Sequence, residues 1–269
     1  MSAFLETMAY RSRQRADVAA RHLPMTALRE AALSGPRPRP LRDFGSTFDV
    51  IAEIKPRSPS EGSFPEHDPV TTADDYQTGG AAMLSVLTEP SAFGGSLDIL
   101  RQVAARSEVP VMAKDFLVDP LQVFEARLAG ADGVLVIARI LSDQVMADII
   151  GSATELGMFS LAEAFDSDDL RRLAAAVDGL ANVLIGVNCR DLDSLDIVPE
   201  RHQELAEHLP PGVVAVAESA IRQPDDVERV AGFGYRAVLV GSALMKHDDP
   251  PRLVHRMVVA GRRAVAVTA

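Results

Sequence analysis

Lysine is rare in this chain, and one lysine stands where an apolar run ends. The stretch VPVMAKDFLVDP (109–120) leads from apolar residues directly into Lys114 and Asp115. The other lysines are Lys55 and Lys246, and arginine supplies the remaining side chains of fixed positive charge. Arginine and lysine are not interchangeable, because only the lysine ammonium loses its proton readily in a protein. The choice of lysine at position 114 therefore raises the question of why this position needs an amine.

Polar and ionisable residues also end other apolar runs of the chain. The residues at or near these ends are Glu53, Lys55, Lys114, Glu163, Asn188, Arg190, Glu218, Ser219, Gly241 and Ser242. Within a strand, alternate residues face the same side, so Glu53 and Lys55 share one face, as do Asn188 and Arg190. Burying unpaired charges costs several kcal/mol. The pattern therefore predicts an ion-pair network, a site for an anionic ligand, or both.

The elements that must position these residues alternate between strand and helix from Asp49 onward. Segments such as 119–131 and 223–235 open with Asp or Pro and close with Gly, as helices do. The predicted strands are 50–55, 82–89, 109–116, 133–140, 158–165, 183–190, 213–219 and 237–244. Apolar strands alternating with helices indicate a covered parallel sheet. The loop EIKPRSPSEG (53–62) lacks the G-x-G-x-x-G of many open sheets, so we predict an α/β fold of the (β/α)₈ TIM-barrel type.

The segment before the first predicted strand has a different pattern. Residues 1–35 are typical of helix, and PRPRP (36–40) ends any helix there. With 269 residues, the chain has room for one barrel or for two smaller domains. We predict a helical extension over 1–45 that packs on a catalytic barrel over 46–269.

Two segments have the composition of a phosphate site. AESAIRQPDDV (217–227) and LVGSALM (239–245) place Ser and small residues where the last two strands give way to helices. TIM barrels commonly bind phosphate at these places through backbone N–H groups. A Gly-Ser pair also serves as an ordinary loop, so it is the two segments together that favour a phosphate pocket.

Composition narrows the classes of partner. The formal net charge is −11, and the chain has no Lys/Arg-rich run, so we expect no nucleic-acid and no membrane partner but a small molecule. No apolar run reaches the length of a signal peptide or a membrane span, which predicts a cytoplasmic protein. The single cysteine, Cys189, excludes an internal disulfide and a cysteine-cluster metal site, and it is expected to be a buried residue rather than a reactive thiol.

The chain resembles the indole-3-glycerol-phosphate synthase family. Its members are (β/α)₈ enzymes of tryptophan biosynthesis with a helical N-terminal extension. The matching segments follow the family's order along nearly the whole barrel, and the motifs AEIK-x-x-SPS and KDF-x-x-DP are specific to it. These segments are IAEIKPRSPSEG (51–62), SVLTEPSAFGGSLDIL (85–100), VPVMAKDFLVDPLQV (109–123), GADGVLVIARIL (130–141), AEAF (162–165), IGVNCRDLDSLDI (185–197), VAESAI (216–221) and VGSALMKHDDP (240–250).

The resemblance implies a lyase that acts on a phosphorylated small molecule. Its substrate would be 1-(o-carboxyphenylamino)-1-deoxyribulose 5-phosphate, converted to indole-3-glycerol phosphate by ring closure, decarboxylation and dehydration. The resemblance further implies a monomer that uses no cofactor and no metal.

The resemblance also assigns roles to residues of this chain. Lys114 would be the general acid that protonates the ketone oxygen, and Glu163 would take part in the later proton transfers. Lys55 would bind the substrate carboxylate, within a network that includes Glu53 and Asn188. The residues that match substrate- and phosphate-binding positions are Ser58, Phe93, Phe116, Arg190, Glu218, Ser219, Ala220, Gly241 and Ser242, with Phe93 and Phe116 against the anthranilate ring.

The choice of lysine at position 114 then has a physical explanation. Lys114 needs a transferable proton, which arginine cannot supply at working pH. We expect neighbouring Lys55 and partial desolvation to lower the pKa of Lys114. By contrast, we expect Lys246 to be a solvated residue at the start of a helix.

The chain departs from the family at several positions. Ala220 stands where the family usually has glycine, and a Cβ there costs about 1 kcal/mol if the backbone needs a positive φ. Ala164, Phe165, Ala92, Pro56 and Arg57 are also unusual. The departures leave open a secondary-metabolism paralogue that acts on a substituted anthranilate. A catalytically silent barrel that serves as a binding partner is the third alternative, which the presence of Lys114 and Glu163 disfavours.

Overall fold

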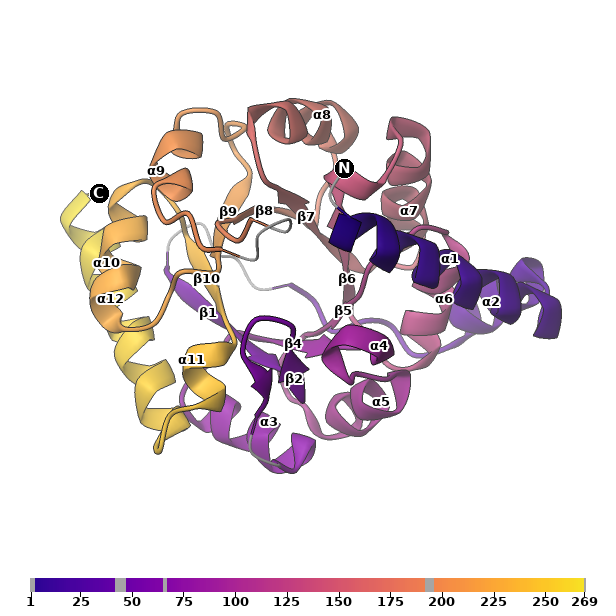
Figure 1. Cartoon of the computed structure of the whole chain (residues 1–269), viewed down its shortest axis with the longest axis horizontal. Helices are drawn as coiled ribbons and strands as arrows, with labels where there is room; N and C mark the ends of the chain where they lie inside the picture. The colour runs from indigo at the N-terminus through magenta and orange to yellow at the C-terminus, as the bar shows by residue number, and fades with distance from the viewer. Residues whose placement is uncertain (1–2, 42–46, 65–66, 192–195, 269) are drawn as a thin grey trace.

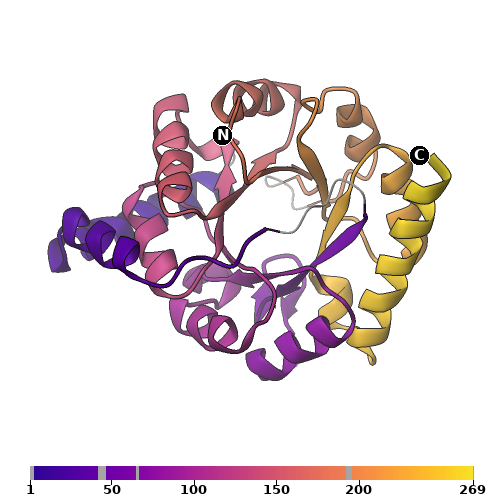
Figure 2. The ribbon, with the colours of Figure 1, turned by 180° about the vertical axis from the view of Figure 1, so that it is seen from behind.

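Eight parallel strands close into a barrel. The computed structural model describes residues 3–41, 47–64, 67–191 and 196–268. Around the barrel the strand order is β1-β10-β9-β8-β7-β6-β5-β4, so each strand pairs with its neighbours in the chain (Figures 1 and 2). The strands are β1 (Asp49–Ile54), β4 (Met83–Leu87), β5 (Val111–Lys114), β6 (Gly133–Ile137), β7 (Phe159–Ala164), β8 (Val183–Asn188), β9 (Val214–Glu218) and β10 (Ala237–Val240). The predicted TIM barrel is confirmed.

A ring of helices covers the outside of the barrel (Figure 1). These helices are α3 (Pro69–Thr78), α5 (Leu97–Arg106), α6 (Leu121–Leu128), α7 (Asp143–Glu155), α8 (Ser167–Val177), α9 (Arg201–Ala206), α10 (Pro224–Gly232) and α12 (Pro250–Thr268). Polar residues begin several of them, since the side chains of Ser96, Ser142 and Asp166 accept hydrogen bonds from backbone N–H groups of the first turns of α5, α7 and α8. Such caps satisfy donors that have no partner within a helix.

The strands end earlier than their sequence pattern predicts. The predicted strand 133–140 ends at Ile137 and continues as the 3₁₀ helix η1 (Ala138–Ile140), and 237–244 ends at Val240 and continues as α11 (Ser242–Met245). Two further elements lie in the loops after strands: the hairpin of β2 (Arg57–Ser58) with β3 (Gly62–Ser63), and α4 (Pro90–Phe93). The hairpin and α4 thus lie in the loops that follow β1 and β4.

The N-terminal extension consists of two helices, as expected. α1 (Ala3–His22) and α2 (Met25–Ser34) lie on one side of the barrel, and both contact α6 (Figures 1 and 2). α1 buries Leu5, Met8, Ser12 and Ala16. The proposed boundary between residues 45 and 46 falls in 42–46, outside the described residues, so the division into 1–45 and 46–269 stays a prediction.

A buried carboxylate ties the segment after α2 to the barrel. Asp132, just before β6, is 2% exposed. Its Oδ1 accepts a hydrogen bond from the Arg39 backbone N–H (2.8 Å), and its Oδ2 accepts from Arg39 Nε (2.6 Å) and from the Val111 backbone N–H (2.9 Å). Arg127 Nη1 lies 3.7 Å from Oδ1. Asp132 thus joins the extension, β5 and α6 in one polar network at the end of the barrel opposite the strand ends that carry Lys114 and Glu218.

Candidate active site

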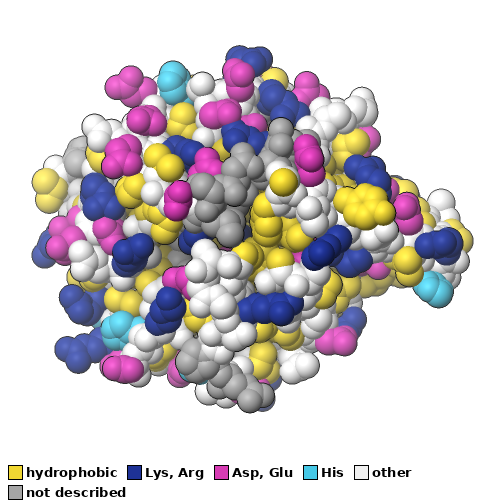
Figure 3. All heavy atoms as spheres, viewed as in Figure 1, with side chains coloured by type: hydrophobic (Ala, Val, Ile, Leu, Met, Phe, Trp, Pro, Cys, Tyr) yellow, Lys and Arg dark blue, Asp and Glu magenta, His cyan; other side chains and the backbone are white. Residues whose placement is uncertain are grey.

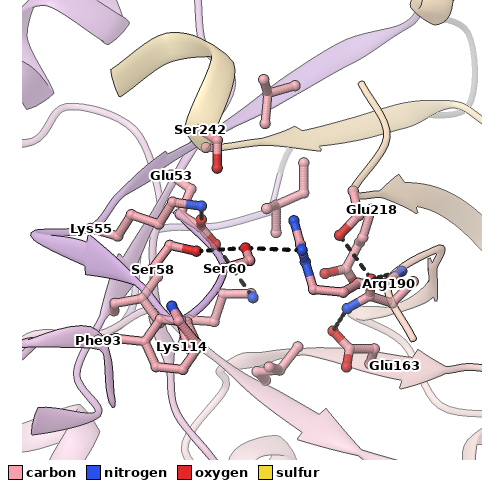
Figure 4. A pocket seen from close by; sticks show the side chains of 18 of the residues that line it. Glu53, Lys55, Ser58, Ser60, Phe93, Lys114, Glu163, Arg190, Glu218 and Ser242 are labelled. Carbon is pink, nitrogen blue, oxygen red and sulfur yellow. Dashed lines mark hydrogen bonds and ion pairs between the residues drawn. The ribbon is translucent and has the colours of Figure 1, made fainter. Parts of the chain in front are cut away.

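One cavity at the C-terminal ends of the strands collects the predicted site residues (Figure 4). Its lining includes Glu53, Lys55, Ser58, Phe93, Lys114, Phe116, Glu163, Asn188, Arg190, Glu218, Ser219, Ala220, Gly241 and Ser242. All fourteen predicted residues therefore meet in one place, because a parallel barrel brings the carboxyl ends of its strands to the same face. On this face Lys and Arg side chains lie among hydrophobic ones (Figure 3). The roles of these residues stay predictions.

A buried carboxylate bridges two of the lysines. Glu53 on β1 places Oε1 2.9 Å from Lys55 Nζ and Oε2 3.3 Å from Lys114 Nζ. Burial raises the pKa of Glu53, but the two lysines outweigh burial and hold that pKa at about 2. Gly241 makes this arrangement possible, because a Cβ at that position would lie 2.2 Å from Glu53 Oε1. The site thus holds a permanent negative charge between two ammonium groups.

The expected pKa shift of Lys114 is wrong in direction. Burial does lower the pKa of Lys114, but Glu53, Glu163 and Glu218 act against burial and raise the pKa above its ordinary value. Lys55 was expected to destabilise the Lys114 ammonium, but Glu53 lies between the two lysines and compensates both. The surrounding carboxylates therefore favour the protonated form of Lys114.

Two further carboxyl groups lie across the barrel. Glu163 on β7 accepts a hydrogen bond from Asn188 Nδ2 (3.2 Å), and Glu218 lies at the end of β9 (Figure 4). Burial raises the pKa of Glu163, and it raises the pKa of Glu218 further because Glu163 repels a second charge. Gly186 on β8 leaves room for Glu218, since a Cβ there would lie 2.1 Å from Glu218 Oε1. The raised pKa values favour the protonated forms of this pair, which suits it to proton transfer.

Three phenylalanines form an apolar wall near Lys114. The ring centroid of Phe116 lies 6.1 Å from those of Phe93 and Phe4. Phe93 ends α4, whose first turn is capped by the buried Glu89 carboxylate, which accepts hydrogen bonds from the backbone N–H groups of Ser91, Ala92 and Phe93. This wall offers stacking and edge contacts for an aromatic ring.

The N-terminal extension holds the loop behind this wall. Arg15 Nη2 on α1 donates to Asp115 Oδ1 (2.6 Å), and Arg15 Nη1 lies 3.6 Å from Glu89 Oε1. Asp115 also accepts a hydrogen bond from Thr88 Oγ1 (3.0 Å) and from the Phe116 backbone N–H (2.8 Å). The carboxylate between Lys114 and Phe116 is therefore a structural junction of α1, β4 and β5.

The turn after β9 has a strained backbone. Ser219 and Ala220 have φ values of +64° and +58°. Glu218 precedes these two residues, and its backbone carbonyl oxygen accepts two hydrogen bonds. The donors are the Cys189 backbone N–H (3.1 Å) and the His202 imidazole Nε2 (3.2 Å). Ser219 Oγ donates to Asn188 Oδ1 (2.9 Å). Ala220 therefore meets the condition of positive φ under which its Cβ is costly.

We expect Ala220→Gly to bind inorganic phosphate more tightly, by up to about fivefold. Glycine adopts positive φ without strain, and the loss of Cβ lets the backbone approach the anion; a gain of about 1 kcal/mol corresponds to this factor. Isothermal titration calorimetry of both proteins measures the change. Unchanged or weaker binding would show that the backbone has adapted to alanine.

Arg190 crosses the mouth of the cavity. It follows β8, and its Nη1 donates to Ser60 Oγ (3.0 Å) in the loop after β1, while Ser60 Oγ lies 3.2 Å from Ser58 Oγ (Figure 4). The backbone carbonyl of Asn188 is held by Arg201 Nη1 at 2.9 Å. A guanidinium in this position can bind a carboxylate or phosphate with two parallel hydrogen bonds.

The structure adds lining residues that the sequence pattern missed. Phe4 comes from the extension, Ser60 and Glu61 from the β2–β3 hairpin, and Leu135 and Ile137 from β6. Strand-end position could have indicated Ile137, but no local signal places Phe4 in a barrel mouth. Lys246 differs from expectation, because it directly follows the last residue of α11 rather than starting a helix, and its Nζ pairs with Glu61 Oε1 at 2.8 Å.

Other expectations concern metals, membranes and the cysteine. Among the described residues, no group of three or more His, Cys, Asp and Glu side chains is arranged to hold a metal ion. Nor does that part of the chain contain a helix with the length and hydropathy to span a membrane. Cys189 is buried, as expected, and burial raises the pKa of its thiol to about 12.

The fold is shared with barrels of distant sequence. 3-Hexulose-6-phosphate synthase from Salmonella typhimurium superimposes with a TM-score of 0.65 at 15% identity, covering 80% of this chain and 99% of that one. Thiamine phosphate pyrophosphorylase from Pyrococcus furiosus superimposes with a TM-score of 0.61 at 15% identity, covering 82% and 99%. At this identity the similarity supports the barrel fold alone.

Sequence comparison is more specific. The family model of indole-3-glycerol phosphate synthase matches residues 8–257. The enzymes of that name from Nocardioides sp. and Beutenbergia cavernae are 47% and 42% identical over 209 and 253 residues, which cover 77% and 92% of this chain and 79% and 92% of theirs. Indole-3-glycerol phosphate synthase 1 of Streptomyces coelicolor is 41% identical, with 92% of each chain covered. The chain belongs to the indole-3-glycerol phosphate synthase family.

Proposed function

We propose that this chain is an indole-3-glycerol-phosphate synthase, a carboxy-lyase of tryptophan biosynthesis. Its substrate is 1-(o-carboxyphenylamino)-1-deoxyribulose 5-phosphate, in which the aryl carbon attacks the ketone before decarboxylation and dehydration. The observation that carries the proposal is the position of Lys114 in one cavity, beside an aromatic wall and across from the Glu163–Glu218 pair. We expect each part of the substrate to meet a complementary surface there.

Lys114 supplies the proton for ring closure. As the aryl carbon attacks, charge develops on the ketone oxygen, which becomes an alkoxide unless it is protonated. An alkoxide is a strong base, so an ammonium of raised pKa can protonate it while remaining charged beforehand. Glu53 keeps Lys114 protonated and limits its movement, with Oε2 3.3 Å from Nζ.

Glu163 and Glu218 handle the later proton transfers. After ring closure and loss of carbon dioxide, dehydration removes a hydroxyl group, which leaves as water once it is protonated, and aromatisation releases a proton. Burial keeps the pKa of both carboxyl groups raised, and repulsion by Glu163 raises that of Glu218 further. Asn188 orients Glu163 through its Nδ2 donor. A carboxyl pair holding a single proton can act first as acid and then as base.

Binding groups surround these three residues. Lys55 can receive the substrate carboxylate, Phe93 and Phe116 can contact the ring, and Arg190 reaches across the mouth. The phosphate fits the turn of Ser219 and Ala220 together with Gly241 and Ser242. We further propose that the chain acts as a monomer in the cytoplasm, without nucleic-acid or membrane partners, and the oligomeric state can be measured by light scattering.

Two alternatives remain distinguishable by experiment. A paralogue that acts on a substituted anthranilate would keep the proton-transfer residues and differ in the ring wall, where Ala92 belongs to α4 beside Phe93. A silent barrel would bind the substrate without turnover. Comparison of kcat/KM for plain and ring-substituted substrates separates the first alternative from the proposed function, and turnover of either substrate excludes the second.

We expect the purified protein to convert the carboxyphenylamino-deoxyribulose phosphate without any added metal or nucleotide. Protonation by Lys114 is the only activation that the ketone requires in this scheme. The appearance of indole fluorescence follows the reaction, with and without EDTA. Loss of activity in EDTA that a divalent ion restores would contradict this prediction.

A further inference from the structure

The tip of the β2–β3 hairpin forms an ion pair with a lysine far away in the sequence. Glu61 Oε1 lies 2.8 Å from Lys246 Nζ, although 185 positions separate the two residues. The side chain of Glu61 is 26% exposed and that of Lys246 is 53% exposed. The pair therefore lies at the rim of the cavity rather than in the protein interior.

This ion pair lies at the phosphate end of the cavity. Glu61 lines the cavity together with Gly241 and Ser242, the residues proposed to bind phosphate. Ser242 begins α11, and Lys246 directly follows its last residue. Lys246 Nζ also lies 5.8 Å from the centre of the Phe64 ring, whereas Lys55 Nζ lies 5.6 Å from the same ring. Phe64 thus contacts two of the three lysines of the chain.

The Glu61 carboxylate lies at the rim beside a residue expected to hold the substrate phosphate, because Glu61 lines the cavity together with Ser242. Burial raises the pKa of Glu61, but hydrogen bonds with Lys246 and Ser242 outweigh burial and lower it. Glu61 Oε1 pairs with the Lys246 ammonium at 2.8 Å, and Glu61 lines the cavity together with Ser242. Phosphate oxygens have a spacing close to that of carboxylate oxygens, so the same donors suit a phosphate.

We infer that Glu61 occupies the phosphate position of the free enzyme as an internal anion, and that the substrate phosphate displaces it and then binds Lys246. Lys246 is thereby a further phosphate-binding residue, and Glu61 lowers the affinity for anions. A rotation of the exposed Glu61 side chain is sufficient for the exchange. The inference rests on the proposed function, since it assumes a phosphorylated substrate.

The test measures how the phosphate Kd changes when Glu61 or Lys246 is replaced. The probe is inorganic phosphate, titrated calorimetrically at constant ionic strength into wild type, Glu61→Gln, Lys246→Met and the double variant. Removing the competing charge at Glu61 should lower the phosphate Kd by about twofold to fivefold, a modest factor because solvent screens the pair. Lys246→Met should raise the Kd by about tenfold through loss of a charged donor. The double variant should lose most of the gain from Glu61→Gln.

The inference requires that the two single substitutions change the phosphate Kd in opposite directions. If the ion pair only fastened the hairpin, both substitutions would break the same contact and shift the Kd in the same direction, which would overturn the inference. Asp248→Asn is the matched control, because it removes one exposed negative charge two residues from Lys246. An equal effect of Asp248→Asn and Glu61→Gln would also overturn it, by showing a general charge effect.

The experiment distinguishes a failure of this inference from a failure of the proposed lyase activity. Phosphate binding is measured without turnover. If the Kd values shift as predicted but the protein does not convert the substrate, the lyase activity is contradicted and the role of the Glu61–Lys246 pair is not. With an active enzyme, Glu61→Gln should lower KM and Lys246→Met should raise it.

Discussion

Replacement of Lys114 by methionine or by arginine is expected to lower kcat by at least about two orders of magnitude. General acid catalysis contributes typically 10²- to 10⁴-fold, or roughly 3 to 5 kcal/mol of barrier. Lys114→Met removes the charge and the proton, whereas Lys114→Arg keeps the charge next to Glu53 but does not release a proton at working pH. Steady-state kinetics with the carboxyphenylamino-deoxyribulose phosphate measure both variants. Substrate binding should weaken less in the arginine variant than in the methionine one.

The pH dependence gives an independent check on Lys114. A general acid is active when protonated, so the rate falls as the pH rises through its pKa. Glu53, Glu163 and Glu218 raise the pKa of Lys114. The alkaline fall of kcat/KM should therefore lie above about pH 10.4, the ordinary pKa of lysine. Glu53→Gln removes the closest carboxylate and should move that fall to lower pH. If Glu53→Gln does not shift the alkaline fall of kcat/KM, that fall reports the titration of a group other than Lys114.

One result would reverse the assignment of the acid. If Lys114→Arg kept most of the wild-type kcat, Lys114 would act only as a fixed charge. The general acid would then be sought at Lys55, which shares Glu53 with Lys114.

Asp132→Ala should lower the free energy of unfolding by about 3 to 5 kcal/mol. The substitution leaves the guanidinium groups of Arg39 and Arg127 without their buried counter-ion, and it leaves the backbone N–H groups of Arg39 and Val111 without an acceptor. Removal of one partner from a buried ion pair typically costs this much. Equilibrium unfolding in urea measures the difference.

The matched control is Asp168→Ala. Asp168 also pairs with an arginine, Arg171 at 3.1 Å, but its side chain is 80% exposed, so its loss should cost less than about 1 kcal/mol. Near-equal effects of the two substitutions would show that the Asp132 network contributes no more than a surface pair. Folded Asp132→Ala protein should keep the wild-type kcat, because Asp132 lies at the opposite end of the barrel from Lys114.

The sequence by itself determined the barrel and most of its chemical groups. Alternating apolar runs and capped helices specify eight βα units, and parallel closure then brings the carboxyl ends of all strands to one face. For that reason Glu53, Lys114, Glu163 and Glu218 could be assigned to one cavity from their positions at strand ends. The unusual Ala220 could likewise be recognised, although only the backbone shows its φ of +58°.

Tertiary structure alone decided the electrostatics and the contacts between distant segments. The sign of the pKa shift of Lys114 depends on Glu53 lying between two lysines, and a Coulomb interaction depends on a distance that residue order does not specify. Phe4 reaches the aromatic wall only because α1 packs against α6 and η1 on one side of the barrel, and Glu61 meets Lys246 only because a hairpin folds toward α11. Local sequence patterns determine which elements form and which residues end them, whereas these contacts arise from loops and helices whose positions depend on the packing of the whole chain.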